Sequence, residues 1–146
     1  MKMSTRGRYG LRVMIELAAN HGKGPVLVET IAKNQGISGK YIHALVPGLR
    51  AAGFVRTVRG PSGGYELARQ PSKVSALEVV AALEGNLAPV DCVTDTGRCA
   101  RVPRCAARDV WCEVAAAIDL VLSSYTLDRL AALERKKLGQ SLDFSI

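Results

Sequence analysis

Hydrophobic residues recur at helical spacing near the start of the chain. Between residues 5 and 20, four apolar positions fall on one face of a helix. They are Leu11, Met14, Ile15 and Ala18. Gly22 and the pair Gly24-Pro25 follow, and they end the helix because glycine accepts a left-handed cap and proline cannot continue a helix. The pattern therefore predicts a first helix from Thr5 to Asn20.

The next two apolar segments predict short helices joined by a tight turn. The first spans Val28–Gln35 and stops at Gly36. Ser38 can cap a third helix that runs to about Leu49, because its hydroxyl can accept a hydrogen bond from the first turn. Pro47 lies inside this helix and is expected to bend it, since proline removes a backbone donor. This arrangement is typical of a helix-turn-helix.

A strand-turn-strand pattern follows the third helix. Residues 54–58 predict a strand, residues 59–64 form a glycine-rich turn, and residues 65–67 predict the returning strand. A helix-turn-helix followed directly by a hairpin is a winged helix. Arg56 and Arg59 at the base of the turn suit a close approach to phosphates or to a groove, although any hairpin needs turn residues.

The second half of the chain predicts more helix, separated from the first half by a loop. A helix is expected over residues 75–83, a loop over residues 86–104 and a long helix from Ala106. Along this long helix, apolar residues alternate at spacings of three and four, which is a heptad seam. They are Trp111, Val114, Ile118, Val121 and Tyr125. We expect the seam to pack on the same helix of a second subunit, the alternative being packing on its own domain.

The predicted fold is therefore mainly α with a small β-hairpin wing, in three parts. Residues 1–85 form a winged helix-turn-helix DNA-binding domain, and residues 86–105 form a cysteine-bearing sensor loop. Residues 106–146 supply a long dimerisation helix and a C-terminal helix. The C-terminal helix is expected to begin at a Thr126 cap, to run through Lys137 and to stop at Gly139.

Composition and charge narrow the function. The 146 residues include 20 Lys+Arg and 13 Asp+Glu, a net charge of +7. Residues 1–73 hold twelve basic and three acidic residues, a net charge of +9, whereas residues 74–146 have a net charge of −2. A basic half beside a slightly acidic half favours a module that binds a polyanion, although a merely solvated surface is the alternative.

Several classes of protein are excluded by the sequence. No apolar stretch approaches the roughly 18 residues that span a bilayer, and the N-terminus lacks the apolar core of a secretory signal. We therefore expect a cytoplasmic protein without a membrane partner, whose cysteines are thiols or metal ligands. The chain has two histidines, no glycine-rich phosphate loop and no metal-binding histidine pair on a helix, so we expect no enzymatic activity.

The winged helix predicts which residues contact double-stranded DNA. Polar residues near the start of the third helix are placed to meet bases or phosphates in the major groove. They are Ser38, Lys40, Tyr41 and His43. Arg59 and Gly60 of the wing would enter the minor groove or hold the backbone, and four further arginines are assigned to phosphates. These are Arg6, Arg8, Arg50 and Arg56. Each charge could instead be only solvated.

Four cysteines are confined to 21 residues, with the spacing C-x6-C-x5-C-x6-C. They are Cys92, Cys99, Cys105 and Cys112. The close pairs typical of zinc sites are absent, and the longer spacing is compatible with an iron–sulfur cluster. Neighbouring arginines would favour thiolates and would also make metal-free redox thiols reactive. Cys112, on the long helix, also suits a buried structural role. The spacing indicates a redox or metal site without deciding the metal.

These segments, in this order, resemble the Rrf-type family of bacterial winged-helix regulators, which includes IscR-, NsrR- and CymR-like members. The resemblance covers nearly the whole chain. It rests on residues 4–11 (STRGRYGL), residues 35–38 (QGIS) with Tyr41, the wing at 58–65 (VRGPSGGY), residues 83–85 (LEG), and the loop cysteines followed by residues 108–111 (RDVW). The family implies a homodimeric transcription factor, usually a repressor, whose DNA affinity follows the state of the cysteine loop.

The resemblance also implies ligands for a cluster, of which [2Fe–2S] is the expected type. Cys92, Cys99 and Cys105 match the three loop cysteines of cluster-binding members, with the first gap one residue longer. The fourth ligand is open. The IscR-like histidine position holds Arg108, and the carboxylate position of other members holds Arg8. Cys112 is the first candidate, and His43 or a residue of the other subunit are alternatives.

A second interpretation needs no cluster. CymR-like members imply a regulator of cysteine or sulfur metabolism that is controlled by a partner protein or by thiol oxidation. An anaerobic visible spectrum separates the two interpretations, because only a cluster colours the protein brown.

Overall fold

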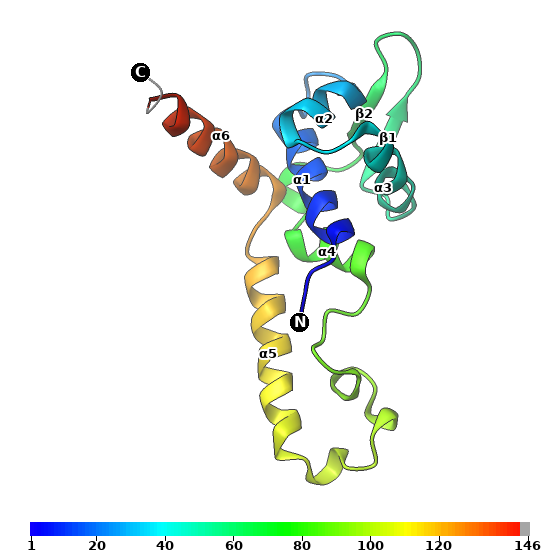
Figure 1. The fold of residues 1–146 in the computed structure, drawn as a ribbon, viewed down its shortest axis with the longest axis vertical. Helices are drawn as coiled ribbons and strands as arrows, with labels where there is room; N and C mark the ends of the chain where they lie inside the picture. The colour runs from blue at the N-terminus through cyan, green and yellow to red at the C-terminus, as the bar shows by residue number, and fades with distance from the viewer. Residues whose placement is uncertain (144–146) are drawn as a thin grey trace.

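The computed structural model describes residues 1–143 of the chain (Figure 1). Six α-helices and one antiparallel hairpin follow one another as α1 (Thr5–Ala19), α2 (Val28–Gln35), α3 (Gly39–Ala51), β1 (Val55–Val58), β2 (Gly64–Leu67), α4 (Ala76–Glu84), α5 (Ala106–Ser123) and α6 (Leu127–Asp143). Single 3₁₀ turns lie at Pro71–Lys73, Asp91–Val93, Thr96–Arg98 and Val102–Arg104. The predicted fold class, mainly helical with a small hairpin wing, is confirmed.

Helices α1–α4 and the hairpin enclose one hydrophobic core, and we call this part the winged-helix body (residues 5–84). Its fully buried side chains come from α1, α2, α3 and α4, and include Met14, Ile31, Ile42, Leu49 and Val79. Leu127 and Ala131 at the start of α6 join the same core, so the last helix packs back on α1. Burial of these apolar groups supplies the main stabilisation of the body.

The helix-turn-helix is built by local signals that the sequence carries. Gly36 ends α2 in the left-handed conformation, with φ of 62°, which glycine adopts without a steric penalty. Ser38 caps α3, and its hydroxyl accepts a hydrogen bond from the backbone N–H of Tyr41 at 3.1 Å. The helix continues past Pro47 to Ala51, beyond the expected end near Leu49, because a single lost donor does not outweigh the buried side chains around it.

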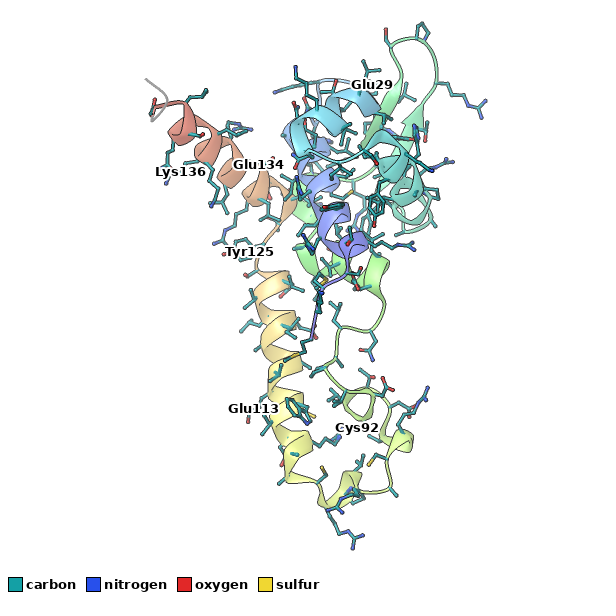
Figure 2. The ribbon with its side chains drawn as sticks, viewed as in Figure 1. Glu29, Cys92, Glu113, Tyr125, Glu134 and Lys136 are labelled. Atoms are coloured by element: carbon teal, nitrogen blue, oxygen red, sulfur yellow. The ribbon has the colours of Figure 1, made fainter. Side chains whose placement is uncertain are left out.

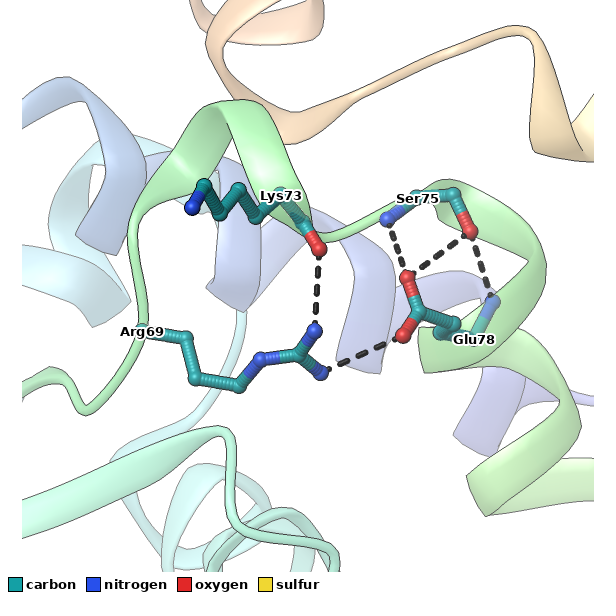
Figure 3. A network of polar contacts seen from close by, with 4 residues as sticks. All are labelled: Arg69, Lys73, Ser75 and Glu78. Carbon is teal, nitrogen blue, oxygen red and sulfur yellow. Dashed lines mark hydrogen bonds and ion pairs between the residues drawn. The ribbon is translucent and has the colours of Figure 1, made fainter.

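A polar network fixes the start of α4 (Figure 3). The backbone N–H of Ser75 donates to the Glu78 carboxylate at 2.8 Å, while the Ser75 hydroxyl accepts from the backbone N–H of Glu78 at 3.2 Å. This is a capping box. Arg69, which follows the hairpin, contacts Glu78 at 3.2 Å and donates to the carbonyl of Lys73 at 3.0 Å. The Ser75 N–H, followed by Arg69 and the Ser75 hydroxyl, lowers the pKa of Glu78.

The loop over residues 86–105 and helix α5 extend away from the body, and we call them together the cysteine arm (residues 86–123). The loop descends from the end of α4 and returns to the start of α5 (Figure 1). No residue of α5 is buried in the single chain. No helix within residues 1–143 has the length and apolar content needed to cross a membrane.

The end of α6 differs from the prediction. The helix runs through Gly139 to Asp143, so the expected stop at Gly139 is wrong. Nothing lies within 4 Å of the position that a Cβ would take at Gly139, and the glycine costs an exposed helix only about 1 kcal/mol relative to alanine. A penalty of that size does not end a helix without a competing cap.

Candidate nucleic-acid interface and cysteine loop

The start of α3 presents polar side chains to solvent. Ser38, Lys40 and His43 are exposed, as a surface that contacts DNA requires. Tyr41 is half-buried, and its ring lies edge-to-face on Tyr9 of α1 with 5.6 Å between the ring centroids. The sequence alone did not reveal this packing role of Tyr41, because it depends on contact with another helix. Only the hydroxyl end of such a ring is suited to a polar ligand.

Two contacts join the recognition helix α3 to the wing. The Nδ1 atom of His43 lies 3.0 Å from the hydroxyl of Tyr65 on β2. The backbone of Tyr65 in turn pairs with Val26, just before α2, through hydrogen bonds of 2.8 and 2.9 Å. The helix-turn-helix and the hairpin are therefore fastened together at Tyr65.

The wing exposes its turn and pairs one of its two arginines. Arg59 and Gly60 are exposed, and Arg59 has no salt bridge among residues 1–143. Arg56 is opposite Glu66 in the strand register, and its Nε atom lies 2.7 Å from the Glu66 carboxylate. The charge of Arg56 is thus partly balanced within the hairpin, whereas the charge of Arg59 is free for an anionic ligand.

Basic side chains from α1 and α3 are exposed beside these elements. Arg6, Arg8 and Arg50 are all exposed. Arg6 reaches across to α3, because a Cβ added to Gly48 would lie 2.9 Å from the Arg6 guanidinium. The guanidinium of Arg8 lies over the ring of Tyr9, 5.6 Å from its centroid. Exposed guanidinium groups of this kind can bind phosphate oxygens.

The four cysteines are reduced, half-buried and distributed along the arm. Cys92 lies on the loop that faces α5 (Figure 2). Cys105 is the residue just before α5, and Cys112 lies within the helix. Among residues 1–143, no three His, Cys, Asp or Glu side chains lie close enough together to hold a metal ion.

The thiols are therefore the right kind of ligand for an iron–sulfur cluster, but they are not positioned to bind one. Thiolates are the ligands that such clusters require, but the cysteines do not converge on one centre in this conformation. A cluster bound by these cysteines would therefore require a different path of the loop.

Arg108 of α5 closes the loop. Its Nε atom donates a hydrogen bond of 2.9 Å to the backbone carbonyl of Cys92, sixteen residues earlier. The position at which the resemblance expects a histidine ligand therefore holds a side chain that fixes the loop backbone. Arg98, which lies in the loop itself, forms an ion pair with Asp95, with 3.4 Å between its Nε atom and the carboxylate.

The heptad seam of α5 is partly exposed in the single chain. Val114 and Ile118 are half-buried, whereas Trp111 and Val121 are 37% and 57% exposed. Tyr125, the last residue of the predicted seam, is half-buried and lies beyond the end of α5 at Ser123. A cavity of about 640 Å³ lies along this face, between α5, the first three residues and the segment that follows α4. The seam predicted from the spacing is therefore only partly covered by the rest of the single chain, and Val114, Ile118 and Val121 line this cavity.

Comparison with known proteins places the chain in a family. Residues 3–133 match the model of the Rrf2 family, which is described as iron-dependent transcriptional regulators. The chain belongs to the Rrf2 family. The HTH-type transcriptional regulator CymR of Bacillus subtilis is 41% identical over 132 residues, which cover 90% of this chain and 91% of that protein. Protein rrf2 of Nitratidesulfovibrio vulgaris is 39% identical over 127 residues, or 87% and 85% of the two chains.

Solved structures agree with this assignment. The structure of CymR, the global cysteine regulator of Bacillus subtilis, superposes with a TM-score of 0.78 at 40% identity, covering 91% of this chain and 98% of that one. IscR of T. potens superposes with a TM-score of 0.74 at 36% identity, covering 96% and 91%. This Rrf2 protein is thus a DNA-binding transcriptional regulator, and the expectation that it is not an enzyme is confirmed.

Some residues of this Rrf2 protein gained a role only from the structure. Sequence patterns did not indicate the contact between His43 and Tyr65 or the hydrogen bond from Arg108 to the loop. Glu84 belongs to the motif at residues 83–85, but nothing in the motif indicated that its carboxylate contacts the start of α1. Each contact joins residues at least sixteen positions apart. Helical spacing and turn composition report only on near neighbours, so they could not reveal these contacts.

Proposed function

We propose that this Rrf2 protein is a homodimeric transcriptional repressor of the cytoplasm whose operator affinity is controlled by the cysteine loop. The observation that carries the DNA-binding part is the exposed start of α3 beside an unpaired Arg59, on the half of the chain with a net charge of +9. Polar groups on a recognition helix, next to free guanidinium groups, match the double-stranded DNA surface in both shape and charge.

In the proposed complex, each recognition helix enters the major groove. Ser38, Lys40 and His43 meet base edges or phosphates there, and the hydroxyl of Tyr41 extends the same polar edge. Arg59, beside Gly60, enters the minor groove, where an arginine is favoured by the negative potential of a narrow groove.

Phosphate contacts complete the proposed complex. Arg6, Arg8 and Arg50 bind the DNA backbone and set the salt dependence of binding. Arg56 contributes less than these three, because Glu66 balances its charge.

The proposed dimer forms through α5. The seam residues Val114, Ile118 and Val121 would pack on the same face of the partner's helix. In the single chain, Val121 is exposed and the other two are only half-buried, so this packing would cover apolar surface that remains accessible. A twofold dimer would place two recognition helices about one helical turn of DNA apart, and so would favour a palindromic operator.

Control by the cysteine loop has two proposed forms. In the first, Cys92, Cys99 and Cys105, with Cys112 as the fourth candidate, bind a [2Fe–2S] cluster after the loop rearranges; the description of the family as iron-dependent supports this form. In the second, the same thiols act without a cluster, through oxidation or a regulatory partner protein. The separated thiols and the similarity to CymR, a global cysteine regulator, favour this form.

Visible absorbance after anaerobic purification distinguishes the two forms. The first form predicts absorbance that is lost when Cys92, Cys99 and Cys105 are replaced together by serine. The second predicts a colourless protein whose DNA affinity changes when the thiols are oxidised with diamide. Serine variants that keep the full response of DNA binding would refute control by the loop in either form.

The DNA-binding part is tested with an operator obtained by selection from a pool of random double-stranded sequences. Arg59→Ala should weaken binding to the selected duplex by about 1–3 kcal/mol, or roughly 5- to 150-fold, as measured by fluorescence anisotropy. Lys136→Ala is the matched control, because Lys136 lies on α6, away from the hairpin (Figure 2), and should leave the affinity unchanged. If no sequence is enriched and no salt-dependent binding occurs, the proposal is wrong.

A further inference from the structure

Glu84, the last residue of α4, caps a helix from which it is distant in the sequence. Its Oε1 atom accepts hydrogen bonds from the backbone N–H of Ser4 at 3.1 Å and from the backbone N–H of Gly7 at 3.0 Å. The hydroxyl of Ser4 donates to the same oxygen. The first turn of any helix has N–H groups without helical partners, and a carboxylate there also interacts favourably with the helix dipole. Ser4 is the N-cap of α1, and its hydroxyl also accepts a hydrogen bond from the backbone N–H of Gly7 at 3.3 Å. Glu84 therefore reinforces this cap from outside the helix.

Close packing holds α1 and α4 at this contact. A Cβ added to Gly7 would lie 2.3 Å from the Glu84 carboxylate, and one added to Gly10 would lie 2.0 Å from a methyl group of Leu83. Both glycines are buried. Only residues without a side chain fit here, so neither helix can shift against the other without breaking the contact.

The contact between Glu84 and α1 lies between the cysteine arm and the basic first turn of α1. On one side, Gly85 ends α4 with a φ of 82°, and the cysteine arm begins at the next residue. On the other side, Gly7 lies between Arg6 and Arg8, which are proposed to bind phosphates. Only Gly85 therefore separates the cysteine arm from Glu84, whose carboxylate binds the helix turn that carries these arginines.

We propose that Glu84 is a positioning residue that couples the cysteine arm to the basic first turn of α1. When the loop pulls Gly85 away, the carboxylate of Glu84 leaves the N–H groups of Ser4 and Gly7, and the Ser4 hydroxyl remains as the acceptor for the Gly7 N–H. A turn whose cap is weakened frays more often, so Arg6 and Arg8 are held less firmly. The regulatory meaning of this coupling rests on the proposed function, but the coupling itself is a property of the protein without DNA.

The test uses a reagent that acts only on the arm. All four cysteines of the chain lie between residues 92 and 112, so N-ethylmaleimide modifies no other region through its thiols. Hydrogen exchange of the Gly7 amide, measured by NMR on the full-length protein without DNA, reports on the cap. In the wild type, modification should accelerate this exchange roughly two- to fivefold, because part of the helix cap is lost while the Ser4 hydroxyl remains.

In Glu84→Ala, the Gly7 amide should exchange at the faster rate with or without the reagent, because the carboxylate that reinforces the cap is already absent. Glu84→Gln, which keeps an acceptor oxygen but loses the charge, should respond with smaller amplitude, and it serves as the second variant if alanine prevents folding. Glu78→Ala is the matched control: Glu78 is the other glutamate of α4, but it caps its own helix, so the response of Gly7 should remain.

Two results would overturn the proposal. One is a Gly7 exchange rate that does not change when the wild type is modified, and the other is a Glu84→Ala variant that responds as the wild type does. Binding of the unmodified wild type to the selected duplex is measured separately. Failure there refutes the proposed function and leaves the coupling result standing.

Discussion

The winged-helix body and the cysteine arm differ in how far they bury their apolar side chains. The body buries its apolar side chains within one chain: Ile42 and Leu49 of α3 are 0% exposed. Helix α5 of the arm buries none of its residues, and Leu120 and Val121 are 72% and 57% exposed. The body is therefore stabilised by its own hydrophobic core. The arm lacks such a core: local hydrogen bonds hold its loop, and the apolar surface of α5 remains accessible to a binding partner. Substitutions should affect the two parts in different ways.

The largest expected effect is in the body. Leu49→Ala removes a fully buried side chain and leaves a cavity, so it should lower the free energy of unfolding by about 2–5 kcal/mol. Leu120→Ala, the matched change on α5, should lower it by less than about 0.5 kcal/mol because the side chain is already exposed. Urea denaturation followed by circular dichroism measures both. If both variants lost the same free energy of unfolding, the body and the arm would share one hydrophobic core.

The second prediction concerns the seam of the arm. Val121→Asp should leave the fold of the single chain intact but place a charge in the proposed dimer interface, raising the dimer dissociation constant by at least about 100-fold. Sedimentation velocity over a range of concentrations measures the change. Leu120→Asp introduces the same charge one residue away, off the heptad seam, and should leave the dimer intact. A dimer broken only by Leu120→Asp would mean that a different face of α5 forms the interface.

The smallest expected effect is the pH dependence of the cap on α4. Because the Ser75 N–H lowers the pKa of Glu78 in the folded protein, the contact stabilises the fold above the unfolded pKa of the carboxyl group. This contribution is lost as the pH falls through the lower pKa of the folded state. Glu78 is 42% exposed, so solvent screening limits the contribution to about 0.5 kcal/mol.

Glu78→Gln should therefore lose this stability at neutral pH and show a weaker decline in acid than the wild type. Thermal unfolding between pH 3 and pH 7 measures the difference. Parallel curves for the two proteins across that range would contradict the assigned cause.

Most of the body could be predicted from the sequence because its signals are local. Gly36, Ser38 and the apolar spacing around them define α2 and α3 through hydrogen bonds and packing within a few residues. The end of α6 could not be placed in this way, because Gly139 is a possible stop whose effect depends on the helix that surrounds it. The return of Leu127 to the core was also beyond sequence patterns, since it depends on backbone pairing between Val74 and Leu127 across more than fifty residues.

The candidate site divides in the same way. Exposure of Lys40, Arg59 and the other charged residues follows from their place on an amphipathic helix or a hairpin turn, and the sequence indicated it. Whether a guanidinium is free or paired depends on the strand opposite, as the contact of Arg56 with Glu66 illustrates. The sequence likewise shows how many cysteines the loop carries and how they are spaced, but not the path of the loop. That path depends on the hydrogen bond from Arg108 of α5 to the backbone of Cys92.

The contacts that hold the wing at Tyr65 affect which DNA groove widths the protein can bind. Val26 and His43 hold Tyr65 from two sides, so the separation between the recognition helix and the wing is set before any DNA is met. Little conformational freedom is then left to lose at these two elements on binding. In the proposed complex, the DNA must therefore adjust its minor-groove width to the protein. Sequences whose minor groove is already narrow, such as A-tracts, should be selected even where no side chain contacts a base.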